Sequence, residues 1–323
     1  MRLAILICGG LLAALPAAGQ TIIGVLGGSA LGTDDAGAVA TIDPGSGAAT
    51  VLGTPIAGES LTGVARLNDG RIVASTATFE GNSRLIEIDP ATGALIQTIG
   101  DFGDGKVLLT MHDLTVDPAT GILYGISIGE LDRPAGRGHG GRPGGGVVTG
   151  SGGPGDQNAI FEIDPANANC TFVGTPPNPD TFMAVAAGGG QLWGMGGGDA
   201  TLYRLDPADG SEELTTAVTG TDGEGALGIG LLTGGANPQF VFSACCTDGI
   251  GNAIFTVDGI TGVATLLGPA GGNRRVHDLA VIPGAGPGPG TIIVEVPVLD
   301  ARGIVALALL LAIAGSALLF WRR

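Results

Sequence analysis

One short pattern of apolar and polar residues occurs five times along the chain. In each copy the second and fourth residues are apolar and the third is polar, which is the period-2 alternation of a β-strand. The fifth residue is always Asp, and Pro or Gly follows it. The pattern therefore predicts five strands that each end in a turn. The copies are Val39–Pro44, Leu85–Pro90, Ile160–Pro165, Leu202–Pro207 and Ile254–Gly259.

The residues after each copy predict a tight turn and a returning strand. Asp accepts a hydrogen bond from the backbone two residues on, Pro fixes φ, and a later Gly adopts the left-handed conformation. Ala168 occupies this last position in the third copy and departs from the rule. Each copy is therefore a predicted hairpin. The glycines in this position are Gly47, Gly93, Gly210 and Gly262.

A second predicted hairpin precedes most copies, as in Leu114–Ile126, so that each repeat has four strands. The five aspartates are 46, 75, 42 and 52 residues apart, and removing the Gly-rich insertion 129–157 shortens the long interval to 46. A period in the forties with four strands per repeat is typical of a β-propeller. The sequence thus predicts an all-β propeller over residues 20–283, with five blades, or six if one is degenerate.

The two ends of this region predict how the ring closes. His277–Ile282 supplies only the first strand of a last repeat, whereas Thr21–Leu26 and the hairpin around Asp43 supply the other strands. Joined, they would complete one blade from both ends of the domain and leave no open sheet edge.

The repeats resemble the YVTN-like and quinoprotein-like propeller superfamily. The resemblance rests on Asp-Pro-Ala-Thr-Gly turns such as 117–121 and on Leu123-Tyr124-Gly125, and it covers most of residues 21–283. It implies the fold and leaves the function open, because one fold carries many functions.

The first 19 residues have the pattern of a signal peptide. Arg2 precedes an apolar run, Leu3–Leu15, that is too short to span a membrane, and small residues lead to a predicted cleavage site after Gly19. The alternative is a buried N-terminal strand. We expect the signal peptide, and hence export.

The C-terminal residues predict a membrane-inserting tail after a Gly/Pro-rich linker at 284–295. The run Gly303–Trp321 is uncharged and apolar, and Arg322 and Arg323 follow it. As a helix it would cross most of a bilayer, with the arginines on the cytoplasmic side. The alternative is a buried core helix, which the lack of a polar face disfavours. Residues 296–323 are therefore predicted to contain a transmembrane helix.

This tail resembles the C-terminal sorting signals of the PEP-CTERM type, in the variant that opens Ile-Pro-Thr-Leu. The resemblance rests on Pro297, Leu299, Gly303, Arg322 and Arg323. It departs from the variant at Val298, in place of Thr, and at 300–302, in place of Ser-Glu-Trp. It implies a Gram-negative bacterium and processing by an exosortase-type membrane protease. The protein would then be at the cell surface or extracellular; a plain single-span anchor would instead leave it facing the periplasm.

The composition of the chain limits the classes of partner and of chemistry that we expect. The formal net charge of −16 repels phosphate backbones, so nucleic acid is not an expected partner. The 62 glycines follow no collagen-like period and fit an all-β domain with many turns. No nucleophile elbow, P-loop or haem attachment motif occurs, and no catalytic residue is predicted.

Two His-Asp pairs are the main candidates for chemistry. His112-Asp113 and His277-Asp278 precede equivalent apolar strands in two repeats, where innermost strands face the ring's centre. One interpretation is a structural His–Asp hydrogen bond. The other is a metal or catalytic site, because a neutral imidazole can ligate a metal and a carboxylate can orient it. The other repeats offer no further ligand at this position, so no cofactor beyond this metal ion is predicted.

Three weaker features remain. The acidic pairs Asp34/Asp35, Asp101/Asp104 and Asp222/Glu224 could bind calcium but match no calcium motif, and solvated turns are the simpler interpretation. The insertion 129–157 holds Arg133, Arg137, His139 and Arg142, and is either a site for an anionic glycan or a disordered loop; Arg274-Arg275 is the other basic pair. Export permits a disulfide from Cys170 to Cys245 or Cys246, or a vicinal bridge.

The sequence therefore favours an exported, surface-displayed or matrix-associated propeller that binds polysaccharide or protein and is more a binding protein than an enzyme. The alternatives are a secreted lactonase-like hydrolase with a metal near the His-Asp pairs, and a purely structural ring.

Overall fold

The computed structural model describes most of residues 20–282. The described ranges are 20–27, 35–77, 83–103, 111–127, 158–177, 182–197, 200–221, 223, 225–233, 237–247, 251–272 and 274–282. They fall within one unit of the chain, Met1–Gly284. The predicted signal peptide, the insertion 129–157, the linker and the C-terminal tail lie outside them. Within these ranges no helix is long and apolar enough to cross a membrane.

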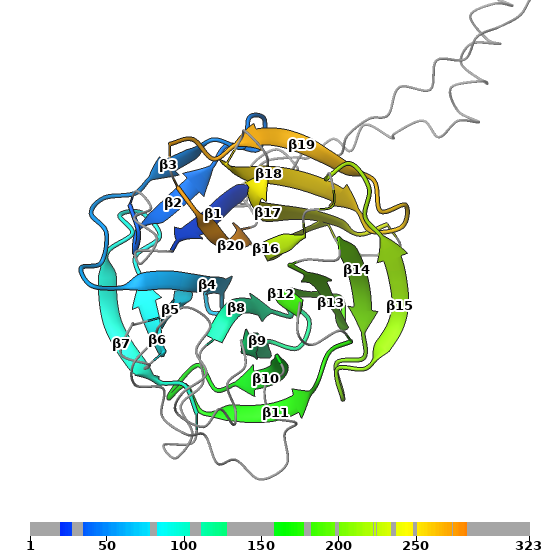
Figure 1. Cartoon of the computed structure of the whole chain (residues 1–323). Helices are drawn as coiled ribbons and strands as arrows, with labels where there is room; N and C mark the ends of the chain where they lie inside the picture. Colours follow the sequence, from blue (N-terminus) through cyan, green and yellow to red (C-terminus); the bar gives the residue numbers. More distant parts are fainter. Residues whose placement is uncertain are drawn as a thin grey trace, which may run out of the picture. The chain divides into compact units, whose positions relative to one another are not determined.

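The described residues form five antiparallel sheets of four strands, arranged in a ring (Figure 1). This confirms the predicted all-β, five-bladed propeller. We number the blades along the chain. Blade 1 contains β20 (Val276–Ile282), β1 (Thr21–Leu26), β2 (Val39–Ile42) and β3 (Ala49–Val51). Blade 2 contains β4 (Ser60–Arg66), β5 (Ile72–Ala77), β6 (Arg84–Ile88) and β7 (Leu95–Asp101).

The other three blades follow in the same order from the innermost strand outward. Blade 3 contains β8 (Met111–Val116), β9 (Leu123–Ser127), β10 (Ala159–Ile163) and β11 (Cys170–Gly174). Blade 4 contains β12 (Phe182–Gly188), β13 (Gln191–Gly196), β14 (Thr201–Leu205) and β15 (Glu212–Ala217). Blade 5 contains β16 (Ala226–Thr233), β17 (Gln239–Thr247), β18 (Gly251–Asp258) and β19 (Ala264–Pro269).

Blade 1 closes the ring from both ends of the domain, as predicted. β20 pairs antiparallel with β1, and Ile23 lies opposite Ala280 in the register. Its innermost strand therefore comes from the C-terminal side of the domain and its other three strands from the N-terminal side. Because strands far apart in sequence share one ladder, separating the blades requires breaking this ladder.

The hydrophobic core lies between the blades, in five clusters. Each cluster joins the facing sheets of two neighbours; Ile22 packs with blade 5 residues, and Ile23 packs with blade 2 residues. Successive side chains of a strand point to opposite faces, so both faces of each sheet are buried. Successive residues of one strand therefore pack against the two neighbouring blades in turn. Aromatic residues enlarge the interface between blades 4 and 5, where Trp193 packs on Phe240.

The five predicted Asp turns form as expected. In the first, Asp43 Oδ1 accepts hydrogen bonds from the backbone N–H of Gly45 at 2.7 Å and of Ser46 at 2.9 Å. These bonds hold the pKa of Asp43 below its usual value. The left-handed position has φ between 64° and 70° in all five turns, including Ala168 at 64°. The first strand and its return strand are thereby fixed in each hairpin.

Two of these turns allow backbone strain and close packing to be tested separately as reasons for the glycine. Gly210 and Gly262 have nearly equal φ values of 70° and 68°, but a Cβ on Gly210 would come no closer than 3.2 Å to another atom, whereas one on Gly262 would lie 2.0 Å from the carbonyl oxygen of Ala217. We expect Gly210→Ala to lower the free energy of unfolding by about 1 kcal/mol through backbone strain alone. Gly262→Ala should cost roughly 3 kcal/mol, since overpacking adds to that strain. Urea denaturation checks both; equal losses would contradict the role of close packing at Gly262.

Candidate functional site

The two His-Asp pairs meet at the centre of the ring. His112 and Asp113 lie at the start of β8 in blade 3, and His277 and Asp278 lie at the start of β20 in blade 1. Only β4 of blade 2 separates these inner strands around the ring (Figure 1). The centres of the two imidazole rings are 5.3 Å apart, with their planes inclined by 49°. Equivalent positions in the sequence thus converge in space.

Asp278 ties three neighbouring blades together. Asp278 Oδ2 accepts hydrogen bonds from the backbone N–H of Val64 in β4 at 2.6 Å and of Leu114 in β8 at 3.3 Å. Its other oxygen accepts one from its neighbour Leu279 at 2.5 Å. One buried carboxylate therefore connects blades 1, 2 and 3 at the axis of the ring.

Asp113 continues this connection to blade 4. Its Oδ2 accepts a hydrogen bond from the backbone N–H of Val185 in β12 at 2.9 Å. Among the described residues its Oδ1 accepts none, and its carboxyl group interacts with that of Asp278. Two carboxyl groups can bond to each other only when one of them carries a proton. Burial and the charge of Asp278 raise the pKa of Asp113 well above its usual value, whereas burial raises that of Asp278 to about 6. Both carboxyl groups are therefore harder to ionise than exposed aspartates, and each affects the ionisation of the other.

The other blades leave room for these aspartates by having small residues at the equivalent position: Gly63, Ala184 and Gly228. A Cβ on Gly228 would lie 2.3 Å from the Cα of Asp278, and one on Gly63 would lie 2.9 Å from the backbone nitrogen of Leu114. The centre is thus filled by two carboxyl groups and closely approaching backbones. These glycines are needed where inner strands of adjacent blades meet.

The histidines do not bond to the aspartates, contrary to the expected His–Asp hydrogen bond. Neighbouring residues of a strand point to opposite faces, so each aspartate points away from the histidine beside it. His112 Nδ1 instead lies 3.1 Å from the carbonyl oxygen of Met183 in β12. His277 is only 8% exposed, and neither of its ring nitrogens has a hydrogen-bond partner in the part of the chain that the structure describes. The structural bonds are therefore made by the aspartates, and the histidines keep nitrogens that nothing saturates.

Both imidazoles are neutral at physiological pH. Burial lowers the pKa of His112 to about 4 and that of His277 well below its usual value. The charge of Arg275 contributes to both shifts, and its own pKa is lowered by burial. Arg275 precedes His277 by two residues, and its Nε is buried without a hydrogen-bond partner. The sequence showed Arg275 as half of a basic pair; the period-2 spacing to His277 was the signal that placed it near this site.

The site lacks the ligands of a closed metal centre. In the part of the chain that the structure describes, no three side chains of His, Cys, Asp or Glu converge on one point. Asp278 is already bonded to backbone N–H groups through both oxygens, so it is a poor metal ligand or general base. The predicted calcium pairs lie partly outside the described residues. Asp35 forms an ion pair with Arg274 at 2.9 Å.

The cysteines lie in different blades. Cys170, on the outer strand of blade 3, forms no disulfide with a described side chain, and burial raises the pKa of its thiol to about 11. Cys245 and Cys246 belong to β17 of blade 5, and blade 4 lies between the two. The side chains of Cys245 and Cys246 are outside the described ones, so the predicted pairing stays a prediction.

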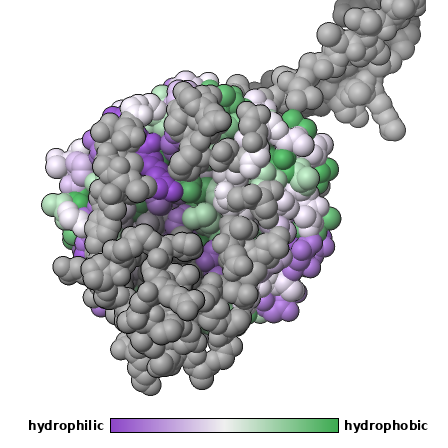
Figure 2. All heavy atoms as spheres, in the orientation of Figure 1, coloured by the Kyte–Doolittle hydropathy of each residue, from purple (hydrophilic) through white to green (hydrophobic). Residues whose placement is uncertain are grey.

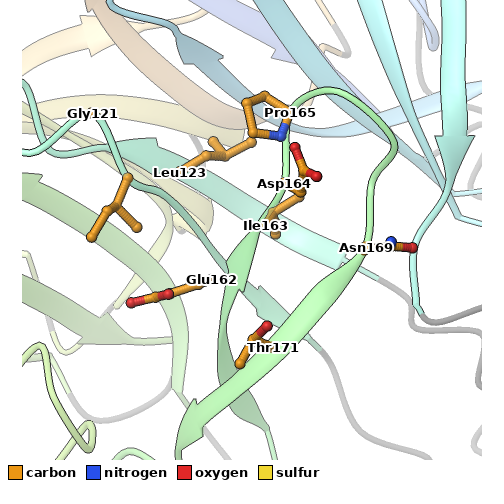
Figure 3. A pocket seen from close by; sticks show the side chains of 9 residues that line it. Gly121, Leu123, Glu162, Ile163, Asp164, Pro165, Asn169 and Thr171 are labelled. Carbon is orange, nitrogen blue, oxygen red and sulfur yellow. The ribbon is translucent and has the colours of Figure 1, made fainter.

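A separate depression of about 430 Å³ lies on blade 3 (Figure 3). Two turns of that blade form it, one around Gly121 and the other around Asp164, and Glu162 and Thr171 complete the lining. The same Asp turn occurs in every blade, so nothing in this lining sets the depression apart chemically. On the face shown in Figure 2, hydrophilic and hydrophobic residues both reach the surface near the centre of the ring.

These features define the protein as a five-bladed β-propeller whose axis is held by a buried pair of aspartates. No protein-family model matches the chain, and no curated protein matches it. Among solved structures it is similar to a chain of a nidogen/laminin complex, with 10% identity, a TM-score of 0.47 and coverage of 81% of this chain and 98% of that one.

Two bacterial structures show weaker likenesses. Apo AztD from Citrobacter koseri has 12% identity and a TM-score of 0.35, with 85% of this chain and 63% of that one covered. The glutaminyl cyclase of Myxococcus xanthus has 13% identity and a TM-score of 0.38, with 68% and 69% covered. At these scores the likenesses identify neither a family nor an activity, and the fold rests on the five four-stranded sheets themselves.

Proposed function

We propose that this protein is an exported β-propeller, displayed at the cell surface or in the extracellular matrix, that binds a polysaccharide or a surface protein. The binding role is supported by the hydrogen bonds that the central carboxyl groups, Asp113 and Asp278, make. They are bonded to backbone N–H groups of neighbouring blades, so they hold the ring together and are not free to take part in hydrolysis. With the central carboxyl groups engaged in this way, we infer that the propeller acts through its surface.

The export half of the proposal is supported by the two ends of the sequence. The pattern of residues 1–19 favours secretion, and the tail at 296–323 favours insertion into a membrane followed by processing near Pro297. The acidic composition, with a net charge of −16, suits a protein that stays soluble outside the cell. A sorting protease is then a partner of the tail, and the ligand is a partner of the propeller.

Intact-mass analysis of the protein from its native host tests export and processing. We expect a chain that begins at Gln20 and ends near Pro297 in the surface or medium fraction. Replacing both Arg322 and Arg323 by Ala should leave the chain unprocessed, because the positive end no longer orients the tail. Asp69→Asn, in a turn of the propeller, is a control that should be processed normally. A full chain to Arg323 found only in membranes would mean a permanent tether, and one that keeps Met1 would refute export.

Binding is tested separately with the purified protein against the polysaccharides and surface proteins of the same host. Saturable binding of one of them is the expected result. Absence of binding across both classes would leave a purely structural ring and overturn the binding role.

A further inference from the structure

The buried histidines at the centre of the ring carry an inference that does not depend on the proposed function. His277 is more than nine-tenths buried, and among the described residues neither of its ring nitrogens has a hydrogen-bond partner. Burying a polar group without a partner is costly, so such groups in a folded protein need an explanation. The backbone of Gly27 lies against the imidazole of His277. A Cβ added at Gly27 would lie only 2.6 Å from the Cδ2 atom of His277. The imidazole is therefore positioned firmly and left unsaturated.

His112 is oriented in the way that a metal ligand is. Its Nδ1 lies 3.1 Å from the carbonyl oxygen of Met183, a distance at which Nδ1–H donates to the carbonyl. The neutral ring then carries its lone pair on Nε2, the nitrogen left for a metal ion. A hydrogen bond from the second ring nitrogen to a backbone carbonyl is the usual way to fix the tautomer of such a ligand.

The spacing of the two rings fits a shared ion. With metal–nitrogen bonds of about 2.0–2.1 Å, each ring centre stands roughly 3.2 Å from the ion, and a tetrahedral angle puts the two centres roughly 5.2 Å apart. The observed separation is 5.3 Å. We propose that His112 and His277 form a two-histidine site for a divalent transition-metal ion at the centre of the propeller, with its remaining positions filled by water.

The surroundings indicate which metal and how tightly it binds. Imidazole ligands suit copper, zinc and nickel, and copper binds most strongly to a given set of nitrogen ligands. The net charge of −16 favours cations in general, whereas the nearby charge of Arg275 opposes a cation at this point. With two protein ligands and this opposing charge, we expect micromolar affinity for Cu²⁺ and weaker binding of Zn²⁺.

Calorimetric titration of the full, untagged protein with Cu²⁺, after removal of metals with a chelator, tests the proposal. We expect one tight site per chain, an affinity at least about tenfold lower in His112→Gln or His277→Gln, and no tight site in the double variant. The chain has three histidines, and His139→Gln removes the third one as a matched control that should bind Cu²⁺ as the wild type does. Arg275→Gln should strengthen Cu²⁺ binding severalfold, because it removes the opposing positive charge.

A measurement on the wild type alone keeps the test independent of folding in the variants. Frozen-solution electron paramagnetic resonance of the Cu²⁺ form should show two imidazole nitrogens, and thermal melting in chelator checks that each variant is folded. No tight Cu²⁺ site in the wild type, a single nitrogen in its spectrum, or a site that survives in the double variant would overturn the proposal. Weaker Cu²⁺ binding in Arg275→Gln would contradict the electrostatic part of it.

Discussion

Asp278→Ala should lower the free energy of unfolding by roughly 3–5 kcal/mol, the range measured when one partner of a buried ionic network is removed. The substitution removes the acceptor of three backbone N–H groups, those of Val64, Leu114 and Leu279. It also leaves the buried carboxyl of Asp113 without its partner. Because the lost bonds come from blades 1, 2 and 3, the change loosens the ring at its axis. Urea denaturation at pH 7 measures the loss.

A turn aspartate provides the matched control for this substitution. Asp89 also accepts hydrogen bonds, from the backbone of Ala91 and the hydroxyl of Thr92, but it is exposed and its bonds are local. Asp89→Ala should therefore lower the free energy of unfolding much less than Asp278→Ala does, because solvent replaces its local bonds. The loss of unfolding free energy in Asp278→Asn should lie between the losses in these two variants. The asparagine keeps one acceptor oxygen, but its NH2 group faces a backbone N–H group that also needs an acceptor. If Asp278→Ala costs no more than Asp89→Ala, the central carboxylate does not hold the blades together.

Asp113→Asn should make the protein relatively more stable as the pH rises. Burial and the charge of Asp278 raise the pKa of Asp113 well above 3.8 in the folded protein, so Asp113 holds its proton to a higher pH there than in the unfolded chain. In the unfolded chain it is ionised above about pH 4. The folded state then binds one more proton, so stability decreases by about 1.4 kcal/mol per pH unit until the folded pKa is reached. The stabilisation that Asp113 provides in this way is fully present below the pKa that it has in the unfolded chain. It is lost as the pH rises through the pKa that it has in the folded protein.

The asparagine removes this titration without removing the hydrogen bonds. Its oxygen can accept from Val185 N–H, and its amide can donate to the ionised Asp278. Above pH 6, where Asp278 is ionised, and in the presence of a chelator, the stability of the wild type should fall with pH more steeply than that of Asp113→Asn until the folded pKa of Asp113 is passed. Asp89→Asn is a control that should keep the wild-type pH dependence, because that carboxyl is ionised in both states. Parallel curves for wild type and Asp113→Asn would show that the pair does not retain a proton.

The repeated pattern of the sequence determined the fold. The Asp turns fix hairpins through local hydrogen bonds that need no other part of the chain, and Asp43 with Gly45 shows the expected geometry. The strand alternation and a period in the forties then leave a propeller as the way to bury both faces of every sheet. Even the closure by β1 and β20 was predictable, because each end of the domain lacks the strands that the other supplies.

The chemistry at the centre was decided by the tertiary structure. The sequence showed two His-Asp pairs at equivalent positions but could not show that blades 1 and 3 bring them together across blade 2. It suggested a hydrogen bond between neighbours, whereas the pleat of each strand turns the aspartate to one face and the histidine to the other. Arg275 was visible only as a basic residue until β20 placed its charge beside the imidazoles.

What the sequence by itself determined is therefore whatever depends on contacts within a few residues or on the regular recurrence of such contacts: the strands, the turns and the blades, of which it favoured five. What only the tertiary structure decided is the partners of the buried polar groups, because these come from strands up to 214 residues apart. A carboxylate far from water takes whichever N–H groups the fold brings to it, and its pKa follows from burial and from its neighbours. Both depend on distances between blades, which no local pattern of residues contains.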